Sequence, residues 1–119
     1  MMDFELNNSL PIWRQLAEQL KERIVIGEYP PGSHFPSVRE LAADAGVNPN
    51  TMQRAMAQLE DEELVITNRT AGRVVTDDKD IIGSTRTLLA LQRTDKFLRD
   101  MKALGYSSDD AVKFIQKGI

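Results

Sequence analysis

The sequence predicts a mainly α-helical fold with a small β-wing, a winged helix-turn-helix domain followed by a helical tail. Three observations predict it: two closely spaced helices over residues 37–45 and 48–59, two β-branched runs directly after them, and an amphipathic segment over residues 80–104. In a winged helix-turn-helix domain the wing is a hairpin that follows such a helix pair. We therefore expect residues 1–76 to form the winged domain and residues 77–119 a two-helix tail.

The first helix is predicted over residues 11–26. Apolar side chains recur at four-residue intervals along one face, and Gly27 provides a stop. These apolar residues are Ile12, Leu16, Leu20 and Ile24. We expect them to lie in the core. Trp13 lies on the same helix, where packing against a neighbouring helix is favoured over stacking on a ligand.

The second helix carries its own start and stop signals. Ser37 and Glu40 have the spacing of a capping box, in which the hydroxyl and the carboxylate each accept a hydrogen bond from an otherwise unpaired backbone N–H. Gly46 supplies the left-handed residue that ends the helix. Asn48 then caps the third helix, and Pro49 occupies its first position, where a missing N–H costs nothing. The turn between the two helices should be short and rigid.

The third helix has an apolar face and a polar face. The apolar face follows the i, i+3, i+4, i+7 spacing and consists of Met52, Ala55, Met56 and Leu59. The polar face carries Asn50, Thr51, Gln53 and Arg54. Amide, hydroxyl and guanidinium groups match base edges and phosphates, although an ordinary solvent-exposed face has the same composition. The segment that follows the helix favours a DNA-reading face.

That segment is a predicted hairpin, because the β-branched runs of residues 64–67 and 73–76 are separated by a polar stretch with a glycine. Arg69 and Arg73 lie near its tip, where guanidinium groups suit phosphate or minor-groove contact beside a helix in the major groove. A purely stabilising hairpin with solvated arginines is the alternative. Joined to the helix pair, the hairpin favours DNA binding.

These motifs together resemble the GntR-type winged-helix transcription regulators. The resemblance covers residues 10–75 and includes the first-helix opening of residues 11–16, the connector of residues 27–32 and the second helix of residues 35–42, in the family's order. Residues 47–55 resemble the YtrA branch in particular. That branch carries a short helical tail in place of a large effector-binding domain.

The resemblance implies DNA contacts from the second helix, the recognition helix and the wing. They fall on Ser37, Arg39, Asn50, Thr51, Gln53, Arg54, Gly72 and Arg73. Pro49 stands where many relatives outside the YtrA branch have an arginine, so a bidentate guanine contact is absent and the target sequence should differ. Glu63 replaces a family glycine after the recognition helix, which predicts a more continuous helix end. Thr70 replaces the first of two wing glycines.

The tail is predicted to mediate dimerisation. Gly105 ends its long helix, and a second capping box, Ser107 with Asp110, starts a short helix with apolar residues on one side. The residues assigned to the dimer interface are Leu88, Leu89, Leu91, Phe97, Leu98 and Met101. Packing of the tail onto its own winged domain is the alternative. A homodimer is favoured because a helical arm presents a self-complementary stripe, and two-fold dimers are the commonest oligomers.

Composition excludes several classes of protein. The 119 residues, 41% of them hydrophobic, suffice for one small domain with an accessory element. The chain has no cysteine, and its single histidine, His34, is expected to be a solvated loop residue. We therefore expect no disulfide, no metal site, no cofactor and no enzyme activity. The sequence starts without a signal-peptide pattern, and no apolar run approaches the roughly 18 residues of a membrane span. We expect a cytoplasmic protein without a membrane partner.

The charge balance is unusual for a DNA-binding domain. Residues 1–76 contain seven Lys or Arg and eleven Asp or Glu, a net charge of −4, whereas a basic footprint is expected. The acidic run of residues 60–63 lies at the far end of the recognition helix from Arg54. We therefore expect few phosphate contacts and a shallow salt dependence. The acidic balance also supports an alternative function, a winged-helix module that binds protein and not DNA.

The predicted function is a homodimeric repressor that binds a two-fold symmetric DNA operator. Each recognition helix would enter a major groove about one helical turn, or 34 Å, from its mate. The resemblance further implies control of a neighbouring operon, often one that encodes a transporter, and response to a small-molecule effector. The sequence itself shows no effector site.

Overall fold

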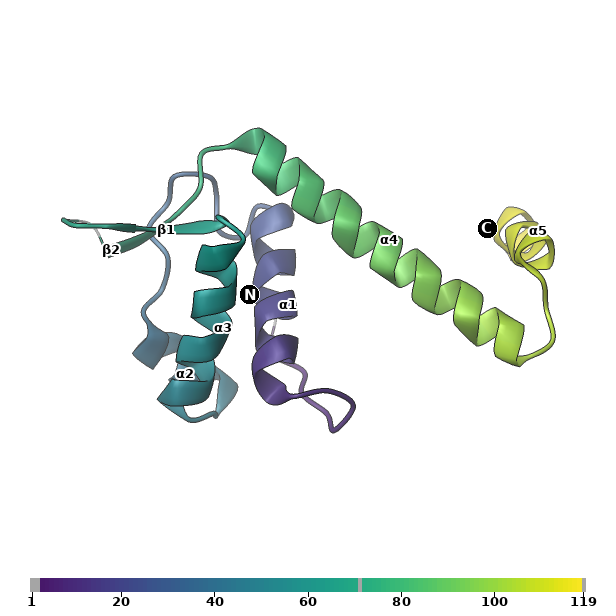
Figure 1. The fold of residues 1–119 in the computed structure, drawn as a ribbon, viewed down its shortest axis with the longest axis horizontal. Helices are drawn as coiled ribbons and strands as arrows, with labels where there is room; N and C mark the ends of the chain where they lie inside the picture. Colours follow the sequence, from purple (N-terminus) through teal and green to yellow (C-terminus); the bar gives the residue numbers. More distant parts are fainter. Residues whose placement is uncertain (1–2, 71, 119) are drawn as a thin grey trace. The chain divides into compact units, whose positions relative to one another are not determined.

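The computed structural model describes residues 3–70 and 72–118. Figure 1 shows a mainly helical chain with a small two-stranded wing, which confirms the predicted fold class. The elements are α1 (Ile12–Val25), α2 (Val38–Ala45), α3 (Pro49–Asp61), β1 (Val65–Asn68), β2 (Gly72–Val75), α4 (Lys79–Ala103) and α5 (Ser108–Gly118). The chain forms two compact units, residues 1–86 and 87–119. These units reflect how the chain packs. The predicted division into a DNA-binding domain of residues 1–76 and a dimerisation tail of residues 77–119 stays a prediction.

The predicted caps around the helix pair are confirmed. Ser37 Oγ accepts a hydrogen bond from the Glu40 N–H at 3.1 Å, and Glu40 Oε1 accepts one from the Ser37 N–H at 3.4 Å. Gly46 ends α2 in the left-handed region with φ +68°. Asn48 Oδ1 then accepts from the Asn50 N–H at 2.7 Å, and Pro49 is the first residue of α3. These caps fix the start of α3 relative to α2.

The end of α3 corrects the prediction of a more continuous helix. Glu63 adopts φ +63°, a left-handed conformation that costs a residue with a Cβ more than it costs glycine. The Glu63 N–H donates to Glu60 O and the Leu64 N–H to Leu59 O, each at 3.0 Å, which is the Schellman pattern. Leu59 and Leu64 are both fully buried. Their burial offsets the strain at Glu63, so the turn forms without glycine.

The core of the first unit lies where α3 packs against α1 and α2, as the side-by-side helices in Figure 1 show. All four residues of the predicted apolar face of α3 are buried, at 0% exposure. In α1 the predicted positions Leu16, Leu20 and Ile24 are buried, while Ile12 in the first turn is half-buried. The core is completed by Phe35, Leu41, Leu64, Val65 and Val75.

The wing is an antiparallel pair in which β1 and β2 lie within one residue of the predicted runs. Thr67 on β1 lies directly opposite Arg73 on β2. The outer edge of β2 is also occupied, since the Phe35 N–H donates to Arg73 O at 2.8 Å and the Val75 N–H donates to Ser33 O at 2.9 Å. Backbone hydrogen bonds therefore hold β2 on both sides.

The helices after the wing also begin and end close to their predicted residues. Asp78 Oδ1 accepts from the Asp80 N–H at 2.9 Å at the start of α4, and Arg86 Nη2 donates to the Val25 carbonyl at 2.5 Å within the first unit. In the second unit Gly105 has φ +92°, and Ser107 and Asp110 form the predicted capping box. Within residues 3–70 and 72–118, no helix combines the length and apolar character needed to cross a membrane.

Candidate nucleic-acid interface

An open groove of about 510 Å³ lies between the start of α2, the N-terminal half of α3 and the wing. The residues that line it include five of the eight predicted DNA contacts. These five are Ser37, Arg39, Gln53, Gly72 and Arg73. The remaining three, Asn50, Thr51 and Arg54, lie on α3 outside the lining. The fold thus brings together residues from three elements that are separated in the sequence.

The α2 side of the groove offers several groups that can bind an anion. Arg39 is exposed in the second position of α2, next to the positive end of the helix dipole. Ser37 Oγ accepts the capping hydrogen bond, so its O–H remains available to donate. His34 is exposed at the same groove, as predicted, and it forms an isolated antiparallel bridge with Val74 of β2. This end of the groove suits a phosphate oxygen.

The polar face of α3 presents its predicted residues to solvent. Asn50, Gln53 and Arg54 are exposed, and Thr51 is half-buried. The Arg54 guanidinium lies over the Trp13 ring, 4.4 Å from its centroid, and so Trp13 contacts a neighbouring helix as predicted. The ring face attracts the cation and restricts its position. A stacked guanidinium keeps its N–H edge free for a base or phosphate oxygen.

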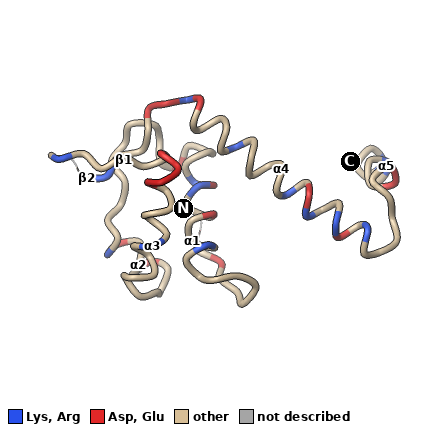
Figure 2. Tube along the Cα trace, in the orientation of Figure 1, with Lys and Arg blue, Asp and Glu red and all other residues tan. Residues whose placement is uncertain are grey.

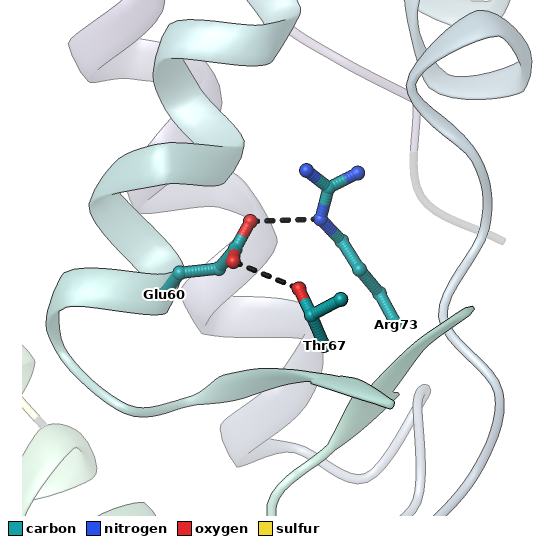
Figure 3. Close-up of polar contacts among 3 residues, drawn as sticks. All are labelled: Glu60, Thr67 and Arg73. Carbon is teal, nitrogen blue, oxygen red and sulfur yellow. Dashed lines mark hydrogen bonds and ion pairs between the residues drawn. The ribbon is translucent and has the colours of Figure 1, made fainter. Parts of the chain in front are cut away.

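A carboxylate at the end of α3 holds the arginine of the wing (Figure 3). Arg73 Nε lies 2.8 Å from Glu60 Oε1, and Thr67 Oγ1 donates to Glu60 Oε2 at 3.0 Å. Arg73 and Glu60 are both half-buried. Arg69, the other wing arginine, is exposed. The two predicted wing arginines therefore lie in different environments, one bound to α3 and one in solvent.

Figure 2 shows the acidic run of α3 at its wing end, away from the N-terminal half of the helix. Two members of this run are neutralised within the first unit. Glu60 pairs with Arg73, and Glu62 accepts from Lys21 Nζ and from Gln58 Nε2, each at 2.7 Å. The negative total charge is therefore partly cancelled in local pairs, and the groove between α2 and the wing carries Arg39 and Arg73.

Sequence reasoning assigned no supporting role in the predicted contacts to three residues, Trp13, Glu60 and Thr67. Trp13 lies beneath Arg54, and Glu60 lies beside Arg73. In each pair the two residues come from different segments of the chain. No local pattern indicates such pairs. Thr67 could have been found from the hairpin register, since the residue opposite Arg73 on the same face of the wing must share its surroundings.

Comparison with known proteins gives a consistent result. The profile of the bacterial regulatory proteins of the gntR family matches residues 12–75. The uncharacterised HTH-type transcriptional regulator YhcF of Bacillus subtilis is 34% identical over 97% of this chain and 95% of its own. The HTH-type transcriptional repressor YtrA of the same organism is 37% identical over 66% of this chain and 60% of its own.

The solved structure of a GntR family transcriptional regulator from Listeria monocytogenes is similar along nearly the whole chain. Its TM-score is 0.83 at 37% sequence identity, and the match covers 94% of this chain and 98% of that one. The relatives are regulators of transcription, so the comparisons favour DNA binding over a protein-binding module. The chain belongs to the gntR family of bacterial regulatory proteins and is a DNA-binding transcriptional regulator.

Proposed function

We propose that the protein is a homodimeric repressor that binds a palindromic operator. The N-terminal half of α3 would enter the major groove, and the wing would lie against the adjacent backbone. The observation that carries this proposal is the groove itself, in which predicted contacts from α2, α3 and β2 face one space. A relative, YtrA of Bacillus subtilis, is named a repressor, which supports repression over activation.

The contacts divide by chemistry into base reading and phosphate binding. Asn50, Gln53 and Arg54 carry the amide and guanidinium groups that pair with purine edges, and they are exposed on one helix. Thr51 is half-buried and suits a phosphate at the edge of the groove. The remaining contacts to the phosphate backbone of the DNA are assigned to Ser37, Arg39, Gly72 and Arg73. Gly72 has φ +73° and no Cβ, so DNA can approach the strand closely there.

Dimerisation is proposed through the tail, where apolar side chains remain in solvent. Leu88 is 52% exposed and Leu91 60% exposed, and Phe97, Leu98 and Met101 are half-buried. Leu89 is already buried in the single chain and has little surface to offer a second copy. Exposed apolar side chains in a row along a helix gain most by pairing with an identical row.

The same proposal places the protein in the cytoplasm, where its operator lies, and assigns it no catalytic activity. Both points are supported by the relatives, which are regulators of bacterial transcription. Double-stranded DNA and a second copy of the chain are the partners that the exposed surfaces fit.

The test is a titration of wild-type and Arg54→Ala protein against the DNA upstream of the protein's own gene, with random duplex as competitor at fixed salt. We expect wild-type binding that resists competitor and a loss of about 1–3 kcal/mol in the variant. Arg14→Ala is the matched control, because Arg14 also lies over Trp13, at 5.4 Å, but belongs to α1. Equal weakness for both duplexes would contradict specific recognition, and a pull-down would then test protein binding.

A further inference from the structure

We propose that Glu60 is a positioning residue that aims Arg73 at a DNA phosphate, so that an acidic side chain strengthens DNA binding. The inference rests on the proposed function, since it requires that the wing contacts DNA. It reverses the usual expectation for a carboxylate beside nucleic acid, which is repulsion of the phosphates. Three features of the structure support it.

The first feature is that one carboxylate holds both strands of the wing. Glu60 Oε1 accepts from Arg73 Nε at 2.8 Å, and Glu60 Oε2 accepts from Thr67 Oγ1 at 3.0 Å. Thr67 and Arg73 are directly opposed in the β1–β2 register. Glu60 therefore links the end of the recognition helix to a cross-strand pair, as Figure 3 shows. This link is one of the contacts that join α3 to the wing.

The second feature is that the backbone of Arg73 is held from the other side. Its carbonyl accepts from the Phe35 N–H at 2.8 Å, and Phe35 is 1% exposed. With the strand anchored and Nε bound, rotation of the arginine side chain is restricted. A long side chain that is ordered before binding loses less conformational entropy when it meets its ligand.

The third feature is the orientation of the terminal nitrogens. The hydrogen bond that Arg73 makes to Glu60 uses Nε, and in Figure 3 the two terminal nitrogens lie at the end of the guanidinium beyond Nε, with no dashed line to either among the residues drawn. Arg73 lines the groove together with Arg39 and Ser37. Two parallel N–H groups on a fixed guanidinium match two phosphate oxygens, and arginine stays charged while it is paired.

The carboxylate has two opposite effects on binding, and their balance defines the test. As a positioning group, Glu60 favours phosphate binding through Arg73. As a charge, it repels phosphate and competes for the same guanidinium. Removal of the side chain should therefore weaken binding if positioning dominates and strengthen it if competition dominates. The sign of the change distinguishes the two.

The experiment measures operator affinity against salt concentration for wild type, Glu60→Ala, Arg73→Ala and the double variant. We expect Glu60→Ala to weaken binding about three- to tenfold and to lower the salt slope by about one, as Arg73→Ala does. The double variant should bind like Arg73→Ala alone. Glu60→Gln should restore most of the affinity, because its amide oxygen can accept from Arg73 Nε and its NH₂ group can donate to Thr67 Oγ1.

Asp61→Ala is the matched control. It removes the same charge from the neighbouring residue, which is exposed. We expect it to leave the affinity unchanged or slightly higher. Thermal melts of each variant separate loss of fold from loss of binding, and the salt slope is a readout that a purely structural role would not move.

Tighter or unchanged operator binding by Glu60→Ala would overturn the inference and assign Glu60 to sequestering Arg73. An Arg73→Ala variant that binds like wild type would also overturn it; if Arg54→Ala still loses binding, the proposed function stands. Wild-type protein that cannot distinguish the operator from random duplex would overturn both.

Discussion

The helices α3 and α4 use their apolar residues in different ways. The 13-residue α3 buries Met52, Ala55, Met56 and Leu59 completely within its own unit. The 25-residue α4 buries Ile82 and Leu89 but leaves Leu88 and Leu91 more than half exposed. The apolar face of α3 is thus buried by folding of one chain, whereas part of that of α4 stays exposed in the single chain. The difference is the one expected if α3 determines the fold and α4 mediates the proposed dimer.

The polar contacts of α4 do not compensate for this exposure. Its ion pairs Lys96–Asp100 and Asp95–Arg99 join residues four positions apart, with each side chain 65% exposed or more. Pairs of this kind contribute only a few tenths of a kcal/mol each. A helix that leaves apolar side chains such as Leu88 and Leu91 in water gains stability when a partner surface covers them. This argument favours the homodimer.

The largest expected effect is in the core of the first unit. Leu59→Ala should lower the free energy of unfolding by about 2–5 kcal/mol, because a fully buried leucine leaves a cavity. Leu91→Ala, at a 60% exposed position, should change it by less than about 0.5 kcal/mol at protein concentrations where the chain is monomeric. Urea denaturation measures both, and equal losses would remove the contrast between the two helices.

The next effect concerns association. Leu88→Asp or Leu91→Asp should give monomers, with the dimer dissociation constant raised by about two orders of magnitude, because a carboxylate is costly to bury in an apolar interface. Sedimentation measures the state, and Gln92→Asp, at an exposed neighbouring position, is the control for charge. A dimer that persists in both leucine variants would exclude this stripe as the interface.

A smaller effect is expected where α1 supports the polar face of α3. Trp13→Leu keeps an apolar side chain but removes the ring beneath Arg54, and so should weaken operator binding by about 0.5–1 kcal/mol. Combined with Arg54→Ala, it should add nothing further. Competition titration measures this coupling, and the dimer state should not change. Additive losses would mean that the ring acts on DNA binding by a route other than Arg54.

The elements themselves were predictable because their signals are local. Each of these signals lies within a few residues of the helix end that it defines. They are the capping boxes, the pair Asn48 and Pro49, and the left-handed glycines, and both capping boxes formed as predicted. Contacts between distant segments carry no such signal. Two such contacts are the stack of Arg54 on Trp13 and the ion pair of Glu60 with Arg73. A third joins Arg23, which is 2% exposed, to Phe4: the guanidinium lies 4.0 Å from the centroid of the ring. They depend on packing that periodicity does not specify.

An effect of similar size concerns the junction between α3 and the wing, where the sequence predicted the wrong helix end. The resemblance to the family leads one to expect glycine at residue 63, yet Glu63 adopts φ +63° because the buried pair of Leu59 and Leu64 holds the Schellman turn. Glu63→Gly should raise the free energy of unfolding by roughly 0.5–1 kcal/mol, the relief of left-handed strain less the extra chain entropy of glycine.

Gly46→Ala is the counterpart at the end of α2, where φ is +68° and a Cβ would meet no atom within 4 Å. It should lower stability by about 1 kcal/mol through backbone strain alone. Thermal melts of the two variants should therefore shift in opposite directions. A loss of stability in Glu63→Gly would mean that the Glu63 side chain contributes more to the junction than its backbone costs, and the strain argument would then fail at this turn.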